Sequence, residues 1–131
     1  MLGVDTNVLV RVLVGDDPAQ HKAAMKRLRA MRRRGEGAFV GPVVLAETGR
    51  VLASVYGYER TRIVAALRGV LATPPFVVTP RDAVLAALDA YEKGPANLAD
   101  YLILELGRTE GCRSLLTFDR RLLKNPTCQS P

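Results

Sequence analysis

The sequence predicts a single α/β domain in which helices cover both faces of a short parallel sheet. Short runs of β-branched and other apolar residues alternate with longer segments of helical periodicity, and this alternation is typical of three-layer α/β/α folds. The chain has 131 residues, of which 48% are hydrophobic, which suits one domain with its own core. We expect four strands in the sheet and leave a fifth open.

Strand and helix alternate twice in the first half of the chain. The apolar run that ends at Asp5 predicts a strand that leads directly into a helix. Asp16-Asp17-Pro18 is typical of a helix start, because carboxylates favour the positive end of a helix and Pro suits its first turn. The expected strands lie at 2–4 and 38–40, and the expected helices lie at 6–14, 18–34 and 42–56.

Proline and glycine separate the elements of the second half. Pro74-Pro75 ends one helix, Gly94-Pro95 separates the next two, and Gly111 ends the last. The residues after Lys124 are poor strand material, so we expect the domain to cover residues 1–124 and a C-terminal tail to follow at 125–131. The expected helices lie at 59–72, 81–91 and 96–109, and the expected strands lie at 76–78 and 114–117.

The composition excludes several kinds of site and suggests a compartment. His21 is the only histidine, and we interpret it as an exposed helix residue, so a zinc site and a serine–histidine triad are excluded. Cys112 and Cys128 form no metal-type pair and suit a reduced compartment. No apolar run approaches the roughly 20 residues of a membrane span, and the N-terminus lacks the features of a signal peptide. We therefore expect a cytoplasmic protein.

The charge balance favours a polyanionic partner. Nineteen Lys and Arg residues oppose 13 Asp and Glu residues, which gives a formal net charge of +6, and arginine matches phosphate geometry. One stripe of the second expected helix carries four basic residues at positions i, i+4, i+7 and i+11. This stripe is either an ordinary solvated face or a surface that guides RNA: Lys22, Lys26, Arg29 and Arg33.

Four acidic residues fall where ligands gather in parallel sheets, beyond the carboxyl ends of the strands. Asp5 ends the first strand and Asp119 ends the fourth, whereas Glu47 lies one to two turns into a helix and Asp100 lies near the start of another. These acids are contributed by separate elements and are expected to meet at one edge of the sheet. Carboxylates at close quarters repel one another, and a divalent cation such as Mg²⁺ or Mn²⁺ removes that repulsion. Such an ion also activates water and neutralises charge on a phosphodiester.

Each acid also has a purely structural interpretation. Asp5 is equally well an ordinary strand-end carboxylate, Asp100 a helix cap, and Asp119 the cap of a helical turn that begins at Arg120. Glu47 lies in a mainly apolar segment without a cation at i+4, although Arg50 lies at i+3. A carboxylate in such a segment must be exposed, paired or bound to a positive group.

Four short motifs resemble those of PIN-domain nucleases, and most closely those of the VapC toxins of bacterial and archaeal toxin–antitoxin pairs. They occur in the same order and with similar spacing over roughly residues 1–124. The motifs are Val4-Asp5-Thr6-Asn7, Leu45-Ala46-Glu47, Asn97-Leu98-Ala99-Asp100-Tyr101 and Leu116-Thr117-Phe118-Asp119-Arg120.

The resemblance implies a metal-dependent endoribonuclease that uses Mg²⁺ or Mn²⁺. It implies that the four acids Asp5, Glu47, Asp100 and Asp119 are the catalytic and metal-binding residues. Asn7, Thr117 and Asn97 would then be supporting polar residues, and Asn97 matches a position where such proteins sometimes carry a further acid. The resemblance also implies an RNA substrate, a homodimer and inhibition by a cognate antitoxin.

Other interpretations of the acids compete with the nuclease. A receiver-type signalling domain expects an acidic pair after the first strand and a Lys after a late one, but Asp5-Thr6-Asn7 and Thr117-Phe118-Asp119 occupy these places. A phosphatase that forms an aspartyl phosphate expects Asp at position 7, which is Asn. The remaining alternative is a catalytically silent RNA- or protein-binding module on the same fold. For the apolar helix faces, around Val51–Val55 and Ile63–Leu71, we expect mostly core with a minority available for a dimer or an antitoxin helix.

Overall fold

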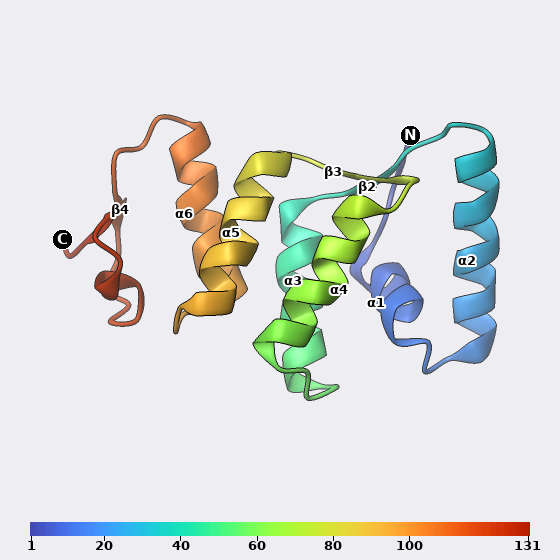
Figure 1. The fold of residues 1–131 in the computed structure, drawn as a ribbon, viewed down its shortest axis with the longest axis horizontal. Coiled ribbons are helices and arrows are strands. Elements are labelled where there is room, and N and C mark those ends of the chain that lie inside the picture. Colours follow the sequence, from blue (N-terminus) through green and yellow to red (C-terminus); the bar gives the residue numbers. More distant parts are fainter.

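The structure, a computed structural model, describes all 131 residues and contains the expected alternation of short parallel strands and helices (Figure 1). Every expected helix is present within a few residues of its predicted bounds. The helices are α1 (Thr6–Val14), α2 (Pro18–Arg33), α3 (Pro42–Ser54), α4 (Arg60–Ala72), α5 (Arg81–Lys93) and α6 (Leu98–Thr109), with a short 3₁₀ helix η1 (Leu122–Lys124). The strands are β1 (Leu2–Gly3), β2 (Ala38–Val40), β3 (Phe76–Val78), β4 (Leu115–Leu116) and β5 (Cys128–Gln129).

The strands form two separate parallel sheets, which corrects the expectation of one sheet. One sheet has the order β1-β2-β3, with Leu2 opposite Ala38 and Ala38 opposite Phe76. The other pairs β4 with β5, with Leu115 opposite Cys128. In Figure 1, β4 and the chain's N-terminus lie towards opposite sides of the molecule, with α5 and α6 between them.

The reason for this division is that the C-terminal segment supplies β4 with a partner. The backbone N–H groups of Leu115 and Thr117 donate to the carbonyls of Thr127 and Gln129 at 3.0 and 3.1 Å. The fifth strand that the sequence left open is therefore present, within residues 125–131. The Asn125 side chain turns the chain back, because its Oδ1 accepts from the backbone N–H and the hydroxyl of Thr127 at 3.0 and 2.7 Å.

The main core lies between the helices, with α4 at its centre. Ile63, Val64 and Leu67 of α4 are completely buried, and Leu71 is 5% exposed, so the predicted apolar face of this helix is confirmed as core. On α3 only Leu52 of the expected face is completely buried, whereas Val55 is 67% exposed. A smaller cluster of Leu28, Met31 and Ala38 lies beneath α2.

The start of α2 lies against the end of α1. Gly15 ends α1 in the left-handed conformation, with φ of 70°, which glycine adopts without steric cost. The chain then turns so that Nδ1 of His21 lies 2.9 Å from the carbonyl oxygen of Arg11. His21 is consequently partly buried, and the expectation of an exposed residue is wrong. Cys112 is exposed, Cys128 is buried, and both are free thiols.

Candidate active site

Asp5 connects the first sheet to α1. It lies two residues beyond the end of β1 and is the N-cap residue of α1, with an extended backbone at φ −81° and ψ 158°. Its Oδ1 accepts a hydrogen bond from the backbone N–H of Thr6 at 2.7 Å, and it takes part in no ion pair. The structural interpretation of Asp5 as a capping carboxylate is thus satisfied, and its second oxygen remains free for another partner.

Glu47 is exposed on α3 and forms an ion pair with Arg50, the cationic residue that lies three positions after it. The guanidinium of Arg50 donates to Oε2 of Glu47 at 2.9 Å. Both residues line a hollow of about 370 Å³ between α3 and the start of α6, together with Asn97. Gly49 permits this close packing, because a Cβ at that position would meet Cδ2 of Leu98 at 3.0 Å.

Asp100 occupies the first turn of α6 and caps that helix. Its Oδ2 accepts from the backbone N–H of Asn97, the N-cap residue, at 3.0 Å. Carboxylates are favoured at this end of a helix, because the backbone N–H groups there have no partner within the helix. The structural alternative for Asp100 is therefore confirmed, and it is compatible with a further role for the other carboxylate oxygen.

Asp119 is held by more groups than any other of the four acids. Its Oδ1 accepts from the backbone N–H groups of Arg121 and Leu122 at 2.8 and 3.4 Å, as the expectation of a capped turn requires. The Arg121 guanidinium donates from Nη2 to Oδ2 at 3.1 Å and from Nε to Oδ1 at 3.4 Å. Thr117 fixes the backbone at this position, because its Oγ1 accepts from the N–H of Asp119 at 2.9 Å.

These contacts shift the pKa values of both Asp119 and Arg121. The pKa of Asp119 is lowered below its usual value, first by the hydrogen bond from the Arg121 side chain and then by the Arg121 backbone N–H. The pKa of Arg121 is raised, mainly by the hydrogen bond and charge of Asp119 and to a smaller extent by the charge of Asp100. Arg121 contacts Asp119 directly and therefore neutralises part of the charge of that carboxylate. The sequence analysis missed Arg121; its spacing of two residues from a strand-end Asp was the available signal.

The expected meeting of all four acids is not found in this structure. No three His, Cys, Asp or Glu side chains lie close enough together to hold a metal ion. Glu47 and Asn97 line one hollow, Asp119 is paired with Arg121, and neither Asp5 nor Asp100 takes part in an ion pair. The physical reason is that β1 and β4, which carry Asp5 and Asp119 at their ends, belong to different sheets. In this arrangement the carboxylates do not fit an ion held by three or more of them.

The remaining predicted residues lie on α1 and α2. Asn7 lines a hollow of about 390 Å³ between these helices, together with Arg11 and Arg27. The four residues of the basic stripe are all exposed, and α2 contains no acidic residue. The stripe is thus a continuous basic face of α2: Lys22, Lys26, Arg29 and Arg33.

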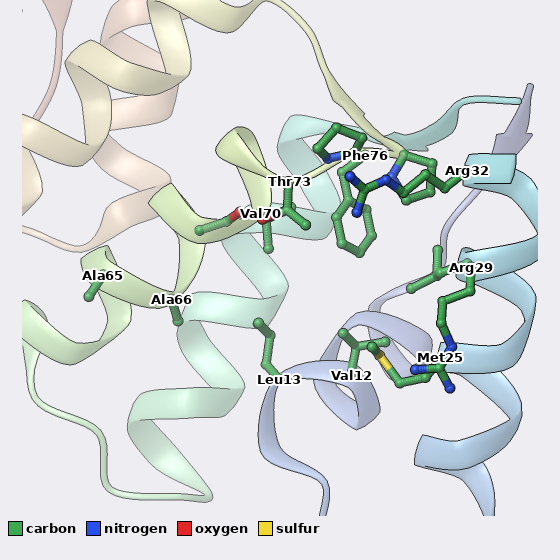
Figure 2. A pocket seen from close by; sticks show the side chains of 14 residues that line it. Val12, Leu13, Met25, Arg29, Arg32, Ala65, Ala66, Val70, Thr73 and Phe76 are labelled. Carbon is green, nitrogen blue, oxygen red and sulfur yellow. Dashed lines mark hydrogen bonds between the residues drawn. The ribbon is translucent and has the colours of Figure 1, made fainter. Parts of the chain in front are cut away.

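An apolar groove lies beside the basic face of α2, and Arg29 belongs to both (Figure 2). It has a volume of about 320 Å³ and is lined from α1, α2, α4 and β3. Val12, Met25, Val70 and Phe76 contribute apolar surface, and Arg32 reaches from α2 towards Phe76.

Comparison with known proteins assigns the family. None of the helices is both long and apolar enough to span a membrane. No curated protein matches the chain. The family model described as the PIN domain matches residues 3–126, a span that contains all four acids, the six α-helices and the strands β2 to β4. Because this match covers nearly the whole chain, the protein belongs to the PIN-domain family, whose three-layer α/β/α members are generally nucleases.

Proposed function

We propose that this protein is an endoribonuclease that depends on Mg²⁺ or Mn²⁺ and uses Asp5, Glu47, Asp100 and Asp119 as its ion ligands. The observation that carries the proposal is the position of Asp5 and Asp119, which lie two residues beyond the end of β1 and three residues beyond the end of β4. Ligand sites of parallel sheets lie beyond these strand ends. Family membership supports a substrate among the nucleic acids, and the basic face of α2 supports a polyanionic one.

The chemistry of the donor set favours a hard cation. The four acids supply oxygen alone, which suits Mg²⁺ and Mn²⁺ better than zinc. Because the structure keeps the four carboxylates apart, their joint action requires Asp5 to approach Asp100 and Asp119.

The test is cleavage of total RNA by the purified protein with Mg²⁺, with Mn²⁺ and with EDTA. We expect cleavage with either ion and none with EDTA. Cleavage that persists in EDTA would contradict the dependence on a metal, and the absence of cleavage with folded protein and bound metal would favour a binding module.

The basic face of α2 is proposed to guide RNA to the site. Replacing Lys26, Arg29 and Arg33 together with Ala should weaken RNA binding. It should also reduce the slope of log affinity against log salt concentration by about two to three, because a variant that makes fewer phosphate contacts releases fewer counterions on binding. Fluorescence anisotropy over a series of salt concentrations measures both quantities. An unchanged affinity and slope would mean that these residues form an ordinary solvated face.

We propose that the protein is the toxin of a type II toxin–antitoxin pair, forms a homodimer and acts in the cytoplasm. The groove in Figure 2 supports a protein partner, because an apolar floor with Arg29 and Arg32 at its margin suits an amphipathic segment with acidic residues. Light scattering tests the dimer, and a species of 14.2 kDa, the mass of one chain, at micromolar concentration would contradict it.

A second candidate function is a catalytically silent RNA- or protein-binding module. The specific observation in its favour is that no three acidic, histidine or cysteine side chains come together. Each of the four acids also has a structural partner of its own, either a backbone N–H or an arginine. Metal binding without RNA cleavage would support this candidate.

A further inference from the structure

A hollow between α1 and α2 begins two residues after Asp5. It has a volume of about 390 Å³, within the range of roughly 300–1,000 Å³ that is typical of sites for small ligands. Each helix contributes residues that are about one turn apart and therefore share a face. None of the lining residues is acidic: they are Asn7, Val8 and Arg11 from α1, and Gln20, Ala23, Ala24 and Arg27 from α2.

The Arg11 guanidinium is held in a fixed position at this hollow. Its Nε donates to Oε1 of Gln20 at 2.7 Å, and its Nη1 donates to Oδ1 of Asp16 at 3.0 Å. The other carboxylate oxygen of Asp16 accepts from the hydroxyl of Tyr56 at 2.6 Å. Nη2 of Arg11 has no partner in the protein, because all of its side-chain hydrogen bonds use Nε or Nη1. A guanidinium that is already ordered loses little further conformational entropy when Nη2 binds another acceptor.

The hollow presents free hydrogen-bond donors and no free carboxylate. Arg27 is exposed, and its side chain takes part in no hydrogen bond or ion pair. Gln20 uses its side-chain oxygen for Arg11, so its amide N–H groups remain free. Asp16 is the acid that holds Arg11, and both of its oxygens are engaged. Donors of this kind, two of them on arginines, favour a phosphate group as the ligand.

The floor of the hollow is apolar. Val8 is 40% exposed although it is a large hydrophobic residue, and Ala23 and Ala24 have small side chains that leave the space open. Inorganic phosphate gains nothing from such a floor, whereas the sugar and the base of a nucleotide have apolar surface that it would remove from water. The cationic margin and the apolar floor together therefore fit a nucleotide better than a simple anion.

We propose that this hollow binds one nucleotide of the RNA substrate. The phosphate accepts from Nη2 of Arg11 and from Arg27, and the sugar and base lie over Val8 and Ala23. This inference rests on the proposed function, because it assigns a substrate-binding subsite beside Asp5. The subsite is separate from the basic face of α2, since no residue of that face lines the hollow.

Ala23→Leu fills the hollow without changing its charge, and Ala19→Leu is the matched control. Both alanines are exposed on α2, but Ala19 does not line the hollow, and leucine is a good helix former at either position. Binding of a labelled single-stranded oligouridylate is measured by fluorescence anisotropy in EDTA, so that neither cleavage nor a metal ion contributes. We expect Ala23→Leu to bind about tenfold more weakly than Ala19→Leu, because the phosphate no longer reaches its charged donors.

Equal affinities of these two variants would overturn the inference, and so would the absence of oligonucleotide binding by the wild type. Neither outcome contradicts the proposed nuclease, which is tested separately by RNA cleavage with Mg²⁺ and Mn²⁺. A protein that shows the tenfold difference but cleaves no RNA with either ion would support the subsite and contradict the nuclease.

Arg27→Gln and Arg34→Gln test the charged margin in the same assay. Both arginines are exposed, and Arg34 is the C-cap residue of α2 and lies outside the hollow. Each substitution removes one positive charge, so a general attraction between the protein and RNA weakens equally in the two variants. We expect Arg27→Gln to bind about fivefold more weakly than Arg34→Gln, because it alone loses a hydrogen bond to the phosphate. Equal affinities would overturn the phosphate contact.

A further measurement uses the wild-type protein alone and does not depend on the folding of a variant. The side-chain amide resonances of Asn7 and Gln20, observed by NMR, report a ligand in the hollow. We expect both resonances to shift on titration with uridine monophosphate and to shift less with the same concentration of inorganic phosphate. Equal shifts with the two ligands would overturn the assignment to a nucleotide, and no shift with either ligand would overturn the site.

Discussion

Asp5→Asn, Asp100→Asn and Asp119→Asn should each lower metal-dependent RNA cleavage by at least about a hundredfold, because each removes a charged ion ligand. The same variants should fold like the wild type. In the structure each of these carboxylates accepts backbone hydrogen bonds at the start of a helix or turn, and an Asn side chain retains an oxygen for that bond. The substitution therefore removes the charge and keeps the cap, so it separates the functional interpretation from the structural one.

Asp82→Asn is the matched control for this series. Asp82 also lies in the first turn of a helix, α5, and it is exposed without an ion pair. Cleavage is measured with Mg²⁺ and with EDTA, and circular dichroism during heating verifies the fold. If the three variants cut RNA as the wild type does, the activity belongs to a contaminant or the site lies elsewhere. If the three variants lose both RNA cleavage and the folded structure, the structural role of the carboxylates is enough to explain the loss of cleavage.

The elements of the fold could be predicted because local patterns determine them. Pro18 and Pro42 begin helices, glycines end several of them, and the apolar face of α4 became the core. The pairing of the strands could not be predicted in the same way, because it depends on contacts between distant segments. The two residues of β4 pair with a tail whose Asn125-Pro126-Thr127 turn was interpreted as a chain end without structure. A side-chain turn of this kind leaves little trace in hydrophobic periodicity.

The candidate site could be predicted to the same extent as the fold: contacts within a short segment followed from the sequence, and contacts between distant segments did not. The partners of the individual acids followed from spacing: Arg50 at i+3 from Glu47, and caps at Asp100 and Asp119. The relation between the acids did not follow from spacing, because it depends on how the β1 and β4 strands are placed. Arg121 lies directly after the motif Leu116-Thr117-Phe118-Asp119-Arg120 and was not predicted as a partner of Asp119, because spacing alone does not show which of the neighbouring cations turns back onto the acid.

Gly94→Ala should destabilise the fold by about 2–3 kcal/mol, the cost typical of overfilling a packed interior. The backbone at Gly94 is extended, with φ −103° and ψ 170°, so any residue could adopt its conformation. The substitution is unfavourable because the packed interior leaves no room for a Cβ atom at this position. A Cβ at this position would overlap the hydroxyl of Tyr101 and would lie 2.8 Å from its Cζ and 2.9 Å from the carbonyl oxygen of Ala90.

The neighbours of Gly94 cannot easily move away. Tyr101 is 4% exposed, and its hydroxyl accepts from the backbone N–H of Ala96 at 3.2 Å. Arg60 holds the same turn from the other side, because its guanidinium donates to the carbonyls of Tyr91, Pro95 and Ala96. This turn joins α5 to α6 and so positions Asn97 and Asp100. A shift of the turn would therefore disturb the candidate site as well as the core.

Thermal unfolding measures the effect, and Gly69→Ala is the control. Gly69 lies within α4, where a Cβ would meet nothing within 4 Å, so Ala should stabilise this helix by roughly 0.5–1 kcal/mol. The two Gly→Ala changes are thus expected to have opposite signs in one protein. For Gly94→Ala we expect a fall in Tm of roughly 10 °C. Adding Tyr101→Phe should cost less in the Gly94→Ala variant than in the wild type, because removing the hydroxyl relieves the overlap. Equal costs in the two proteins would show that Tyr101 is not the obstacle and that the α5–α6 turn is less rigid than its contacts indicate.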